Sequence, residues 1–383
     1  MKKIVSILLT LTLLLPVTYS KVRAAEPMVA GKSALLMDVA TGTVLYAHNE
    51  TQPLAPASVT KVMTMLLIME AIDSGKIGWE DPVTASETAA AKGGSQIYLK
   101  AGETMTVRDM LKSIAVSSAN DCACAMAEHL AGSEGAFVEQ MNRRAGELGM
   151  ENTHFVNCTG LDDDPEAKEH KTSAKDIALM SVELLKNHPD IKQFTTIWMD
   201  TVRDGAFGLS NTNKLVRFYN GATGLKTGFT AAAGYCLSAS AMRDGMELVA
   251  VVMGCETSQE RFQACKSLLD FGFANYAQVS VAPEAGAGSV PVKLGTENRV
   301  ATQPVGETVF LVDKGQRGSV TTEVNLEPQV TAPVSKGQRL GTLTVRAEGK
   351  ILAQLPLVAA QSVPRLTWAD IFLGILRLCA FSQ

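Results

Sequence analysis

The sequence has no excess of basic residues, and it lacks the short motifs of several large enzyme classes. Its 35 lysines and arginines are outnumbered by 39 aspartates and glutamates, which gives a formal net charge of −4 at pH 7. Such a chain lacks the excess of positive charge that is typical of nucleic-acid-binding proteins. It contains no Gly-x-Ser-x-Gly elbow, no His-Glu-x-x-His zinc motif, no P-loop and no dinucleotide-binding fingerprint. No motif places any of its five histidines beside a serine.

The cysteines do not have the pattern of a disulfide framework. Their number, seven, is odd, and they are scattered over a long chain among small apolar residues. Cys122 and Cys124 are two residues apart, so on a helix their side chains diverge and do not form a zinc-binding pair. The sequence therefore predicts reduced, buried, structural thiols. The seven are Cys122, Cys124, Cys158, Cys236, Cys255, Cys265 and Cys379.

The first 25 residues have the pattern of a signal peptide. Lys2 and Lys3 precede a short apolar run, and small residues at Ala24 and Ala25 offer a cleavage site. The run is too short for a transmembrane helix and contains Pro16. We therefore expect residues 1–25 to be removed and the mature protein to be exported.

Residues 26–276 alternate between strand and helix patterns in an order that predicts an α+β domain. Two β-rich runs at 33–39 and 43–48 form a hairpin at the beginning of this region. A second hairpin, 235–242 with 246–253, lies near its end, and a helix over 259–273 follows. Helical patterns fill the middle. This order predicts one antiparallel sheet assembled from both ends of the region, with helices packed against it.

The remainder of the chain divides into two parts. Residues 277–362 contain short alternating runs separated by glycine and proline, which predicts a small all-β domain, a β-sandwich. Residues 363–383 return to a helical pattern with polar residues on one narrow stripe and Trp368 among the apolar ones. This segment is too short to span a bilayer but fits an amphipathic helix at a membrane surface. The alternative is a helix docked on the β domain.

Residues 56–70 place a lysine in an otherwise apolar segment. Apart from Lys61 and a few hydroxyls, the segment is hydrophobic on nearly all sides, which predicts a buried helix. A buried ammonium is costly, so its pKa falls. Ser58 lies three residues before Lys61 and shares its helix face, and Pro56 is typical of a helix start. A nucleophile, a base and a backbone oxyanion donor would then lie within one turn. The alternative is that Ser58 caps the helix and Lys61 extends to solvent.

Two further motifs follow in fixed order. Ser118-Ala-Asn120 interrupts two helical patterns, and Lys226-Thr227-Gly228 leads into a strand pattern. Each motif alone is a weak signal. The ordered set, together with the Ser-x-x-Lys pair, is typical of penicillin-recognising serine enzymes.

Longer segments resemble the D-alanyl-D-alanine carboxypeptidases, the low-molecular-mass penicillin-binding proteins, over roughly residues 30–275. This resemblance implies a β-lactamase/transpeptidase-like fold, peptidoglycan stem peptides and β-lactams as partners, and action at the extracytoplasmic face of a bacterial membrane. It implies no metal and no cofactor. The segments are Pro56-Ala-Ser-Val-Thr-Lys-Val-Met-Thr64, Ser118-Ala-Asn-Asp-Cys122, His170-x-Thr-Ser-Ala-x-Asp176, Asn211-Thr-Asn-Lys-Leu215, Gly224-Leu-Lys-Thr-Gly228 and Leu268-Leu-Asp-Phe-Gly-Phe273.

The resemblance also implies a role for each catalytic residue. Lys61 removes the proton of Ser58 as Ser58 attacks the penultimate D-alanine carbonyl. The backbone N–H groups of Ser58 and Phe229 bind the oxyanion. Ser118 passes a proton to the leaving nitrogen, and Asn120 holds Lys61 and the substrate amide.

Substrate binding falls to the third motif and one arginine. Lys226 polarises the hydroxyl of Ser118, and Lys226 and Thr227 bind the terminal carboxylate together with Arg261. Gly228 completes the motif before Phe229.

Two other functions share parts of this pattern. A class A β-lactamase has all three motifs, but it needs a Glu-x-x-Leu-Asn signature that the segment around Glu151 lacks. A non-catalytic wall-associated module would have lost catalytic side chains, and all of them are present in this sequence.

Overall fold

A five-stranded antiparallel sheet forms the centre of the first folded region. The computed structural model describes residues 26–163, 165–281 and 287–381, so the predicted signal peptide at 1–25 lies outside the described residues. The strand order is β2-β1-β9-β8-β7. The bounds are β1 Ser33–Asp38, β2 Val44–His48, β7 Ala222–Thr230, β8 Gly234–Arg243 and β9 Met246–Cys255.

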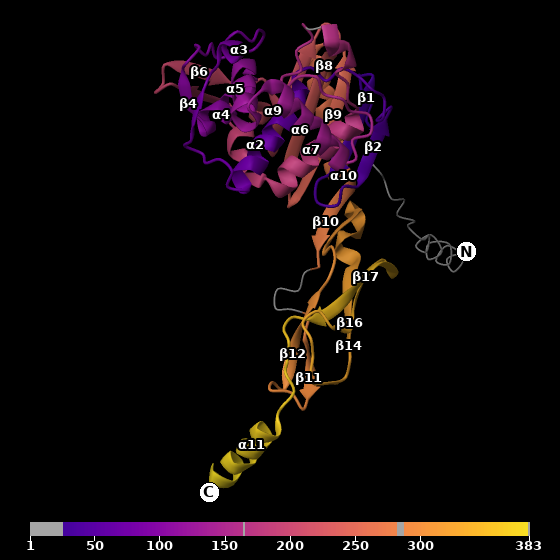
Figure 1. The fold of residues 1–383 in the computed structure, drawn as a ribbon. Coiled ribbons are helices and arrows are strands. Elements are labelled where there is room, and N and C mark those ends of the chain that lie inside the picture. Colours follow the sequence, from indigo (N-terminus) through magenta and orange to yellow (C-terminus); the bar gives the residue numbers. More distant parts are fainter. Residues whose placement is uncertain (1–25, 164, 282–286, 382–383) are drawn as a thin grey trace, which may run out of the picture.

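Strands from the two ends of this region meet in the middle of the sheet. β1 pairs with β9 from Ser33 opposite Met253 to Asp38 opposite Leu248. Both hairpins are found where the sequence predicts them, and helices lie beside the sheet (Figure 1). The predicted α+β fold is therefore confirmed.

The sheet is buried on both faces, and the central strand shows why. Along β9, Val249, Val251 and Met253 belong to the core shared with the larger group of helices. Leu248, Ala250 and Val252 alternate with them and belong to the core beneath α10. Because successive side chains of a strand point to opposite faces, a strand covered on both sides is a continuous apolar run.

Helices make up nearly half of the sequence between the two hairpins, and α10 follows the second hairpin. Two of the longer ones, α2 and α10, lie where the sequence predicts helices over 56–70 and 259–273. The longer helices are α2 Lys61–Asp73, α4 Val107–Ser117, α5 Asn120–Ala131, α6 Glu134–Glu147, α7 Ala174–Asn187 and α10 Ser258–Asn275. The short ones are η2 Ala57–Thr60, α3 Glu87–Ala90, η3 Pro165–Glu169, η4 Pro189–Ile191, α8 Lys192–Thr195 and α9 Leu215–Phe218.

Two small hairpins extend from the helical side, and the sequence analysis did not predict them. One pairs β3 (Pro82–Thr84) with β4 (Thr104–Thr106), and the other pairs β5 (Met199–Val202) with β6 (Phe207–Ser210). These strands are only three or four residues long, so their alternation is too short to stand out from that of a loop.

The second folded region is all-β, as predicted. β10 continues directly from α10, pairs with β13 and leads into a six-stranded sheet of order β14-β16-β17-β12-β11-β15. Only two residues of β12 are buried. The bounds are β10 Tyr276–Ser280, β11 Ser289–Lys293, β12 Arg299–Pro304, β13 Val309–Asp313, η5 Lys314–Ser319, β14 Val320–Leu326, β15 Val330–Thr331, β16 Arg339–Ala347 and β17 Lys350–Ala359.

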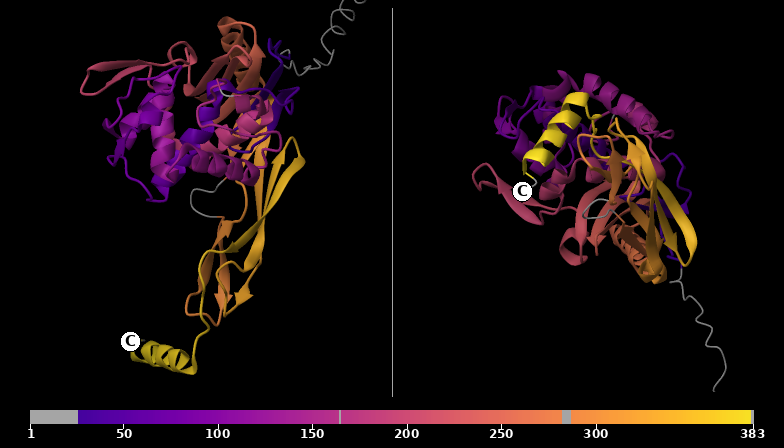
Figure 2. Two further views of the ribbon diagram at one scale, coloured as in Figure 1. Left: turned by 45° about the horizontal axis from the view of Figure 1, so that its top comes forward. Right: turned by 90° about the horizontal axis from the view of Figure 1, so that it is seen from below.

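The C-terminal helix lies at the far end of this β domain from the sheet-and-helix region (Figures 1 and 2). α11 spans Trp368–Phe381. It begins where Thr367 and Asp370 bond to each other's backbone N–H groups. Trp368 is 88% exposed and Phe372 is 63% exposed. Within the described ranges, no helix is long and apolar enough to cross a membrane.

Six of the seven cysteines lie in the described part of the chain with their side chains placed. All six are free and buried, which confirms the prediction for them. Cys379, whose side chain is outside the described part, is not tested.

Candidate active site

Ser58 and Lys61 occupy consecutive turns at the beginning of the buried helix. Ser58 is the second residue of η2, a 3-10 turn that precedes α2, whereas the sequence predicts one continuous helix. Side chains three residues apart eclipse on a 3-10 turn, so the two still meet. The Nζ atom of Lys61 lies 3.0 Å from Oγ of Ser58 and donates to the carbonyl of Thr159 at 2.8 Å. The N–H groups at the beginning of a helix have no acceptor within it, which leaves that of Ser58 available.

Lys61 is fully buried, so the alternative in which it extends to solvent is wrong. Burial lowers the pKa of Lys61 from 10.5 to about 7, and the charges of neighbouring acidic groups only partly oppose this. An amine with this pKa is partly neutral at physiological pH. It can therefore accept a proton from the hydroxyl that it contacts.

Ser118 and Asn120 lie in the connection between α4 and α5. Ser118 ends α4 in a left-handed conformation with φ of 63°. The side-chain amide of Asn120 donates to the carbonyl of Gly93 at 2.7 Å. Its Oδ1 atom is buried and accepts no hydrogen bond from the described residues. Such an acceptor is costly to leave unpaired, and it is available to an ammonium or a substrate amide.

Lys226 and Thr227 lie on β7, one of the two edge strands of the sheet. Lys226 is buried, and its Nζ atom donates to the carbonyl of Thr227 at 2.9 Å. Its burial, together with the charges of Lys61 and Arg261, holds the pKa of Lys226 well below its usual range. The hydroxyl of Thr227 bonds to that of Thr212 at 2.7 Å. No hydrogen bond between the Ser118 and Lys226 side chains is found within the described ranges.

Gly228 explains how β7 reaches the nucleophile. A Cβ atom at Gly228 would lie 2.6 Å from the carbonyl oxygen of Pro56 and 3.1 Å from the backbone nitrogen of Val59. These distances are too short for any side chain, so only glycine lets the strand backbone pack against the turn that carries Ser58. The first and third motifs therefore meet in space, as the sequence predicts.

Phe229 lies near the end of β7, and Arg261 reaches the same strand end from α10. Nη1 of the buried Arg261 donates to the carbonyl of Gly228 at 2.9 Å, and its guanidinium lies against the ring of Tyr235. The Phe229 ring is 53% exposed and is 4.2 Å from that of Tyr235, centroid to centroid. Arg261 thus supports the strand end from within the protein. Its contact with a substrate carboxylate stays a prediction.

Three site residues were missed by the sequence analysis. Thr159 supplies the carbonyl that holds Lys61, and a backbone contact of this kind leaves no sequence signal. Thr212, which contacts Thr227, lies inside the Asn-Thr-Asn segment that carries part of the resemblance. Asp121 follows Asn120 and is buried, and its carboxylate accepts from the backbone N–H groups of Ile97 and Leu99. It thereby fixes the loop at 93–99 beside the second motif.

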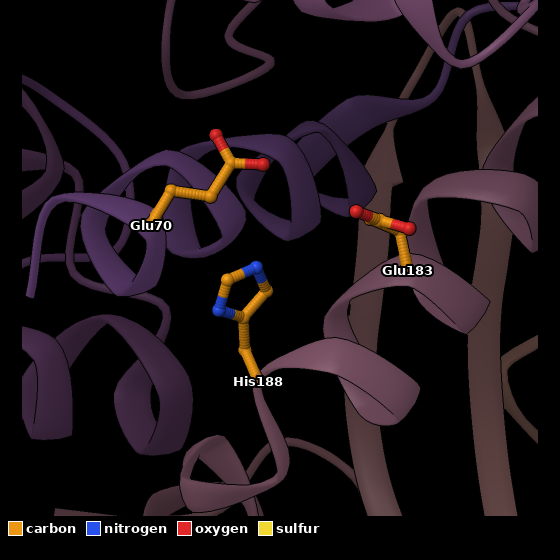
Figure 3. A group of neighbouring side chains, drawn as sticks. All are labelled: Glu70, Glu183 and His188. Carbon is orange, nitrogen blue, oxygen red and sulfur yellow. The ribbon is translucent and has the colours of Figure 1, made fainter. Parts of the chain in front are cut away.

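One group of side chains within the described ranges has the spacing of a metal site. It comprises Glu70 on α2, Glu183 on α7 and His188 just after α7 (Figure 3). Arg144 on α6 pairs with Glu70 at 2.7 Å and with Glu183 at 2.6 Å, while His188 contacts Asp73. A guanidinium between the two carboxylates occupies their oxygens and offsets part of their repulsion, so we interpret the group as an ion-pair network that joins three helices.

Comparison with known proteins gives consistent matches over both folded regions. A family model described as D-alanyl-D-alanine carboxypeptidase matches residues 20–257, and one described as penicillin-binding protein 5, C-terminal domain, matches residues 280–365. The chain is 43% identical to D-alanyl-D-alanine carboxypeptidase DacF of Bacillus subtilis, over 95% of each chain.

Solved structures show the same likeness. Penicillin-binding protein 5 of Haemophilus influenzae is 30% identical, with a TM-score of 0.74, over 89% of this chain and 100% of that one. Penicillin-binding protein D2 of Listeria monocytogenes, in its ampicillin-bound form, is 32% identical with a TM-score of 0.59. That match covers 65% of this chain and 100% of the Listeria chain.

Proposed function

Since the chain belongs to the D-alanyl-D-alanine carboxypeptidase family, Peptidase S11, we propose that it removes the terminal D-alanine from peptidoglycan stem pentapeptides. Removal of this residue limits cross-linking, because the peptide that ends in D-Ala-D-Ala is the acyl donor for that reaction. The observation that carries the proposal is the contact between the Ser58 hydroxyl and the Lys61 amine, whose pKa is about 7.

Acylation begins when the neutral amine of Lys61 takes the proton of Ser58. Oγ of Ser58 then attacks the carbonyl of the penultimate D-alanine, and a tetrahedral oxyanion forms. The backbone N–H groups of Ser58 and Phe229 stabilise that oxyanion. Ser118 delivers a proton to the nitrogen of the leaving D-alanine, and the acyl-enzyme remains on Ser58.

Binding of the substrate uses the cationic edge of the site. The terminal carboxylate pairs with Lys226 and Thr227, with Arg261 close behind them, and Asn120 accepts from a substrate amide through its unpartnered Oδ1 atom. Recognition of a terminal carboxylate makes the enzyme a carboxypeptidase rather than an endopeptidase. Water then hydrolyses the acyl-enzyme.

β-Lactams acylate the same serine, because the carbonyl of their strained amide and their carboxylate lie in the same relation as those of the D-Ala-D-Ala end of the substrate. A class A-like β-lactamase, the competing hypothesis, is not favoured. The family model and the Bacillus subtilis relative are both carboxypeptidases by description. A separate C-terminal domain also matches that of penicillin-binding protein 5.

The division into domains supports the proposal that the protein is attached to a membrane surface. In this proposal, residues 26–276 are the catalytic domain, residues 277–362 are a spacer, and residues 363–383 bind the outer face of the cytoplasmic membrane. The exposed Trp368 and Phe372 on α11 supply apolar side chains for the interface. Flotation with anionic lipid vesicles, with and without residues 363–383, tests this part of the proposal.

The activity is tested on purified protein and its Ser58→Ala variant. We expect a fluorescent penicillin to form a long-lived adduct, and diacetyl-lysyl-D-Ala-D-Ala to release D-alanine. The variant should lose both. Rapid loss of the label without release of D-alanine would indicate a β-lactamase and refute the proposal.

A further inference from the structure

A chain of three hydrogen bonds leads from the backbone of Val156, through a buried histidine, to the residue before the nucleophile. The N–H of Val156 donates to Nδ1 of His170 at 3.2 Å. Nε2 of His170 lies 2.8 Å from the hydroxyl of Thr60, and that hydroxyl donates to the carbonyl of Ala57, also at 2.8 Å. His170 and Thr60 are 3% and 0% exposed, so water does not compete for these bonds.

The direction of each bond follows from the first one. A backbone N–H can donate only to an unprotonated ring nitrogen, so the proton of His170 is on Nε2. Nε2 then donates to the Thr60 hydroxyl, whose own hydrogen goes to Ala57. Burial, with smaller effects from the charges of His154 and Lys61, lowers the pKa of His170 to about 4, which keeps the ring neutral near pH 7.

The carbonyl at the end of this chain belongs to the same peptide group as the N–H of Ser58. In a planar trans peptide, the C=O of one residue and the N–H of the next point in opposite directions. A hydrogen bond that fixes the Ala57 oxygen therefore also fixes where the Ser58 N–H points. That N–H is one of the two oxyanion donors of the proposed function.

The backbone at this point needs such support. Ala57 has φ of 48°, a left-handed conformation that non-glycine residues rarely adopt. A Cβ atom on Gly160 would lie 1.9 Å from the Ala57 oxygen, so the loop after Asn157 packs directly against the same carbonyl. The 3-10 turn η2 helps to orient this peptide, and the contacts with the Thr60 hydroxyl and with Gly160 hold it further.

We propose that His170 and Thr60 are positioning residues, which aim the Ser58 N–H at the oxyanion through the Ala57 carbonyl. The proposal rests on the proposed function and adds to it two residues that help to stabilise the oxyanion in the transition state. Neither side chain needs to touch the substrate. Their loss should slow acylation and leave binding of the substrate unchanged, because the oxyanion forms only after attack.

The size of the effect is bounded by the loss of a whole donor. Removing one oxyanion donor from a serine hydrolase lowers kcat by about 100- to 1000-fold. A donor that is present but misdirected should cost less, so we expect Thr60→Val and His170→Ala to lower the acylation rate constant by roughly 10- to 100-fold. The KM for peptide should change by less than about threefold, since the ground state does not use this donor.

The test compares four variants and a control. Thr60→Ser and His170→Gln retain a hydroxyl and a side-chain N–H at the required places, so both should recover most of the rate lost in Thr60→Val and His170→Ala. Ser181→Ala is the matched control. It removes another buried hydroxyl of the same domain, which bonds to the carbonyl of Ile177 and to Ser238.

Stopped-flow acylation by penicillin gives the rate constant and the dissociation constant separately, and thermal unfolding gives the stability of each variant. A slow rate constant with unchanged affinity, restored in the conservative variants and absent in Ser181→Ala, supports the proposal. A boronic acid inhibitor, whose tetrahedral adduct resembles the oxyanion, should lose affinity in parallel. Equal rates in Thr60→Val and Ser181→Ala would overturn the proposal, as would losses that follow only the melting temperature.

These outcomes are separate from a failure of the proposed function. If the wild-type protein forms the penicillin adduct but releases no D-alanine, the carboxypeptidase assignment fails. The role of His170 and Thr60 is still decided by the acylation rates.

Discussion

The protonation state of Lys61 should set the pH dependence of acylation. The amine acts as a base only when it is neutral, and its pKa is lowered to about 7 by burial. Below that pH, the rate of acylation should fall tenfold for each pH unit, and above it the rate should level off. An ordinary lysine, with a pKa near 10.5, would still be gaining activity at pH 9.

The expected gain from burial follows from these two pKa values. At pH 7 about half of the Lys61 amines are neutral, whereas at the ordinary pKa about one in three thousand would be neutral. Burial changes the free-energy difference between the two protonation states by about 5 kcal/mol. Burial therefore supplies a base at neutral pH that the same side chain could not provide in water.

The assay is the rate constant of acylation by a penicillin, measured from pH 5 to 9 on wild type and on Lys226→Arg. Lys226 also has a lowered pKa, so its protonation is the competing explanation for an acid limb, that is, a fall in the acylation rate at low pH. An arginine does not titrate in this range, so the limb near pH 7 must persist in the variant if Lys61 causes it. A rate that is independent of pH from 5 to 8, or a limb that disappears in Lys226→Arg, would refute the assignment to Lys61.

Three further predictions concern the framework of the site. Lys61→Met should abolish acylation yet raise the melting temperature near pH 6–7. Between pH 7 and 10.5 the unfolded wild-type chain binds a proton that the folded chain does not, so the stability of the wild type rises with pH over that window. The higher stability of the variant, measured by calorimetry, should therefore shrink toward pH 10. Gly228→Ala should lower acylation at least 100-fold by pushing β7 away from Pro56, a prediction that unchanged labelling by penicillin would contradict. Arg144→Met should destabilise the protein by about 2–3 kcal/mol, because it leaves two half-buried carboxylates without their counterion. Melting curves would show this as a drop of roughly 4–10 °C, with kcat per folded molecule unchanged, and a melting temperature equal to wild type would show that the network contributes nothing.

Much of the fold could be predicted because its main elements give strong signals. The two hairpins are β-rich runs joined by turn residues, and α2 is hydrophobic on nearly all sides. The short hairpins of β3 with β4 and β5 with β6 lack such signals, because three or four residues show too little alternation.

The catalytic side chains were also predictable, but the contacts that position them were not. Ser58 and Lys61 lie close in sequence, so helix geometry alone indicates that they meet. The carbonyl of Thr159 and the close approach of Gly160 to Ala57 depend on how a distant loop packs, and backbone atoms carry no residue-specific signal. No motif connects His170 with Thr60, so their contact becomes visible only in the folded structure.

The site gathers several features that oppose stability around one turn. A buried amine at Lys61, an unpaired oxygen on Asn120 and a left-handed backbone at Ala57 each cost free energy in an ordinary core. They persist because close backbone packing at Gly160 and Gly228 holds the turn from two sides. Each costly feature corresponds to a step of the proposed reaction: the amine takes a proton, the oxygen accepts from the substrate, and the strained peptide aims the oxyanion donor. The same local conflicts that make this turn unfavourable for folding therefore make it competent for acyl transfer.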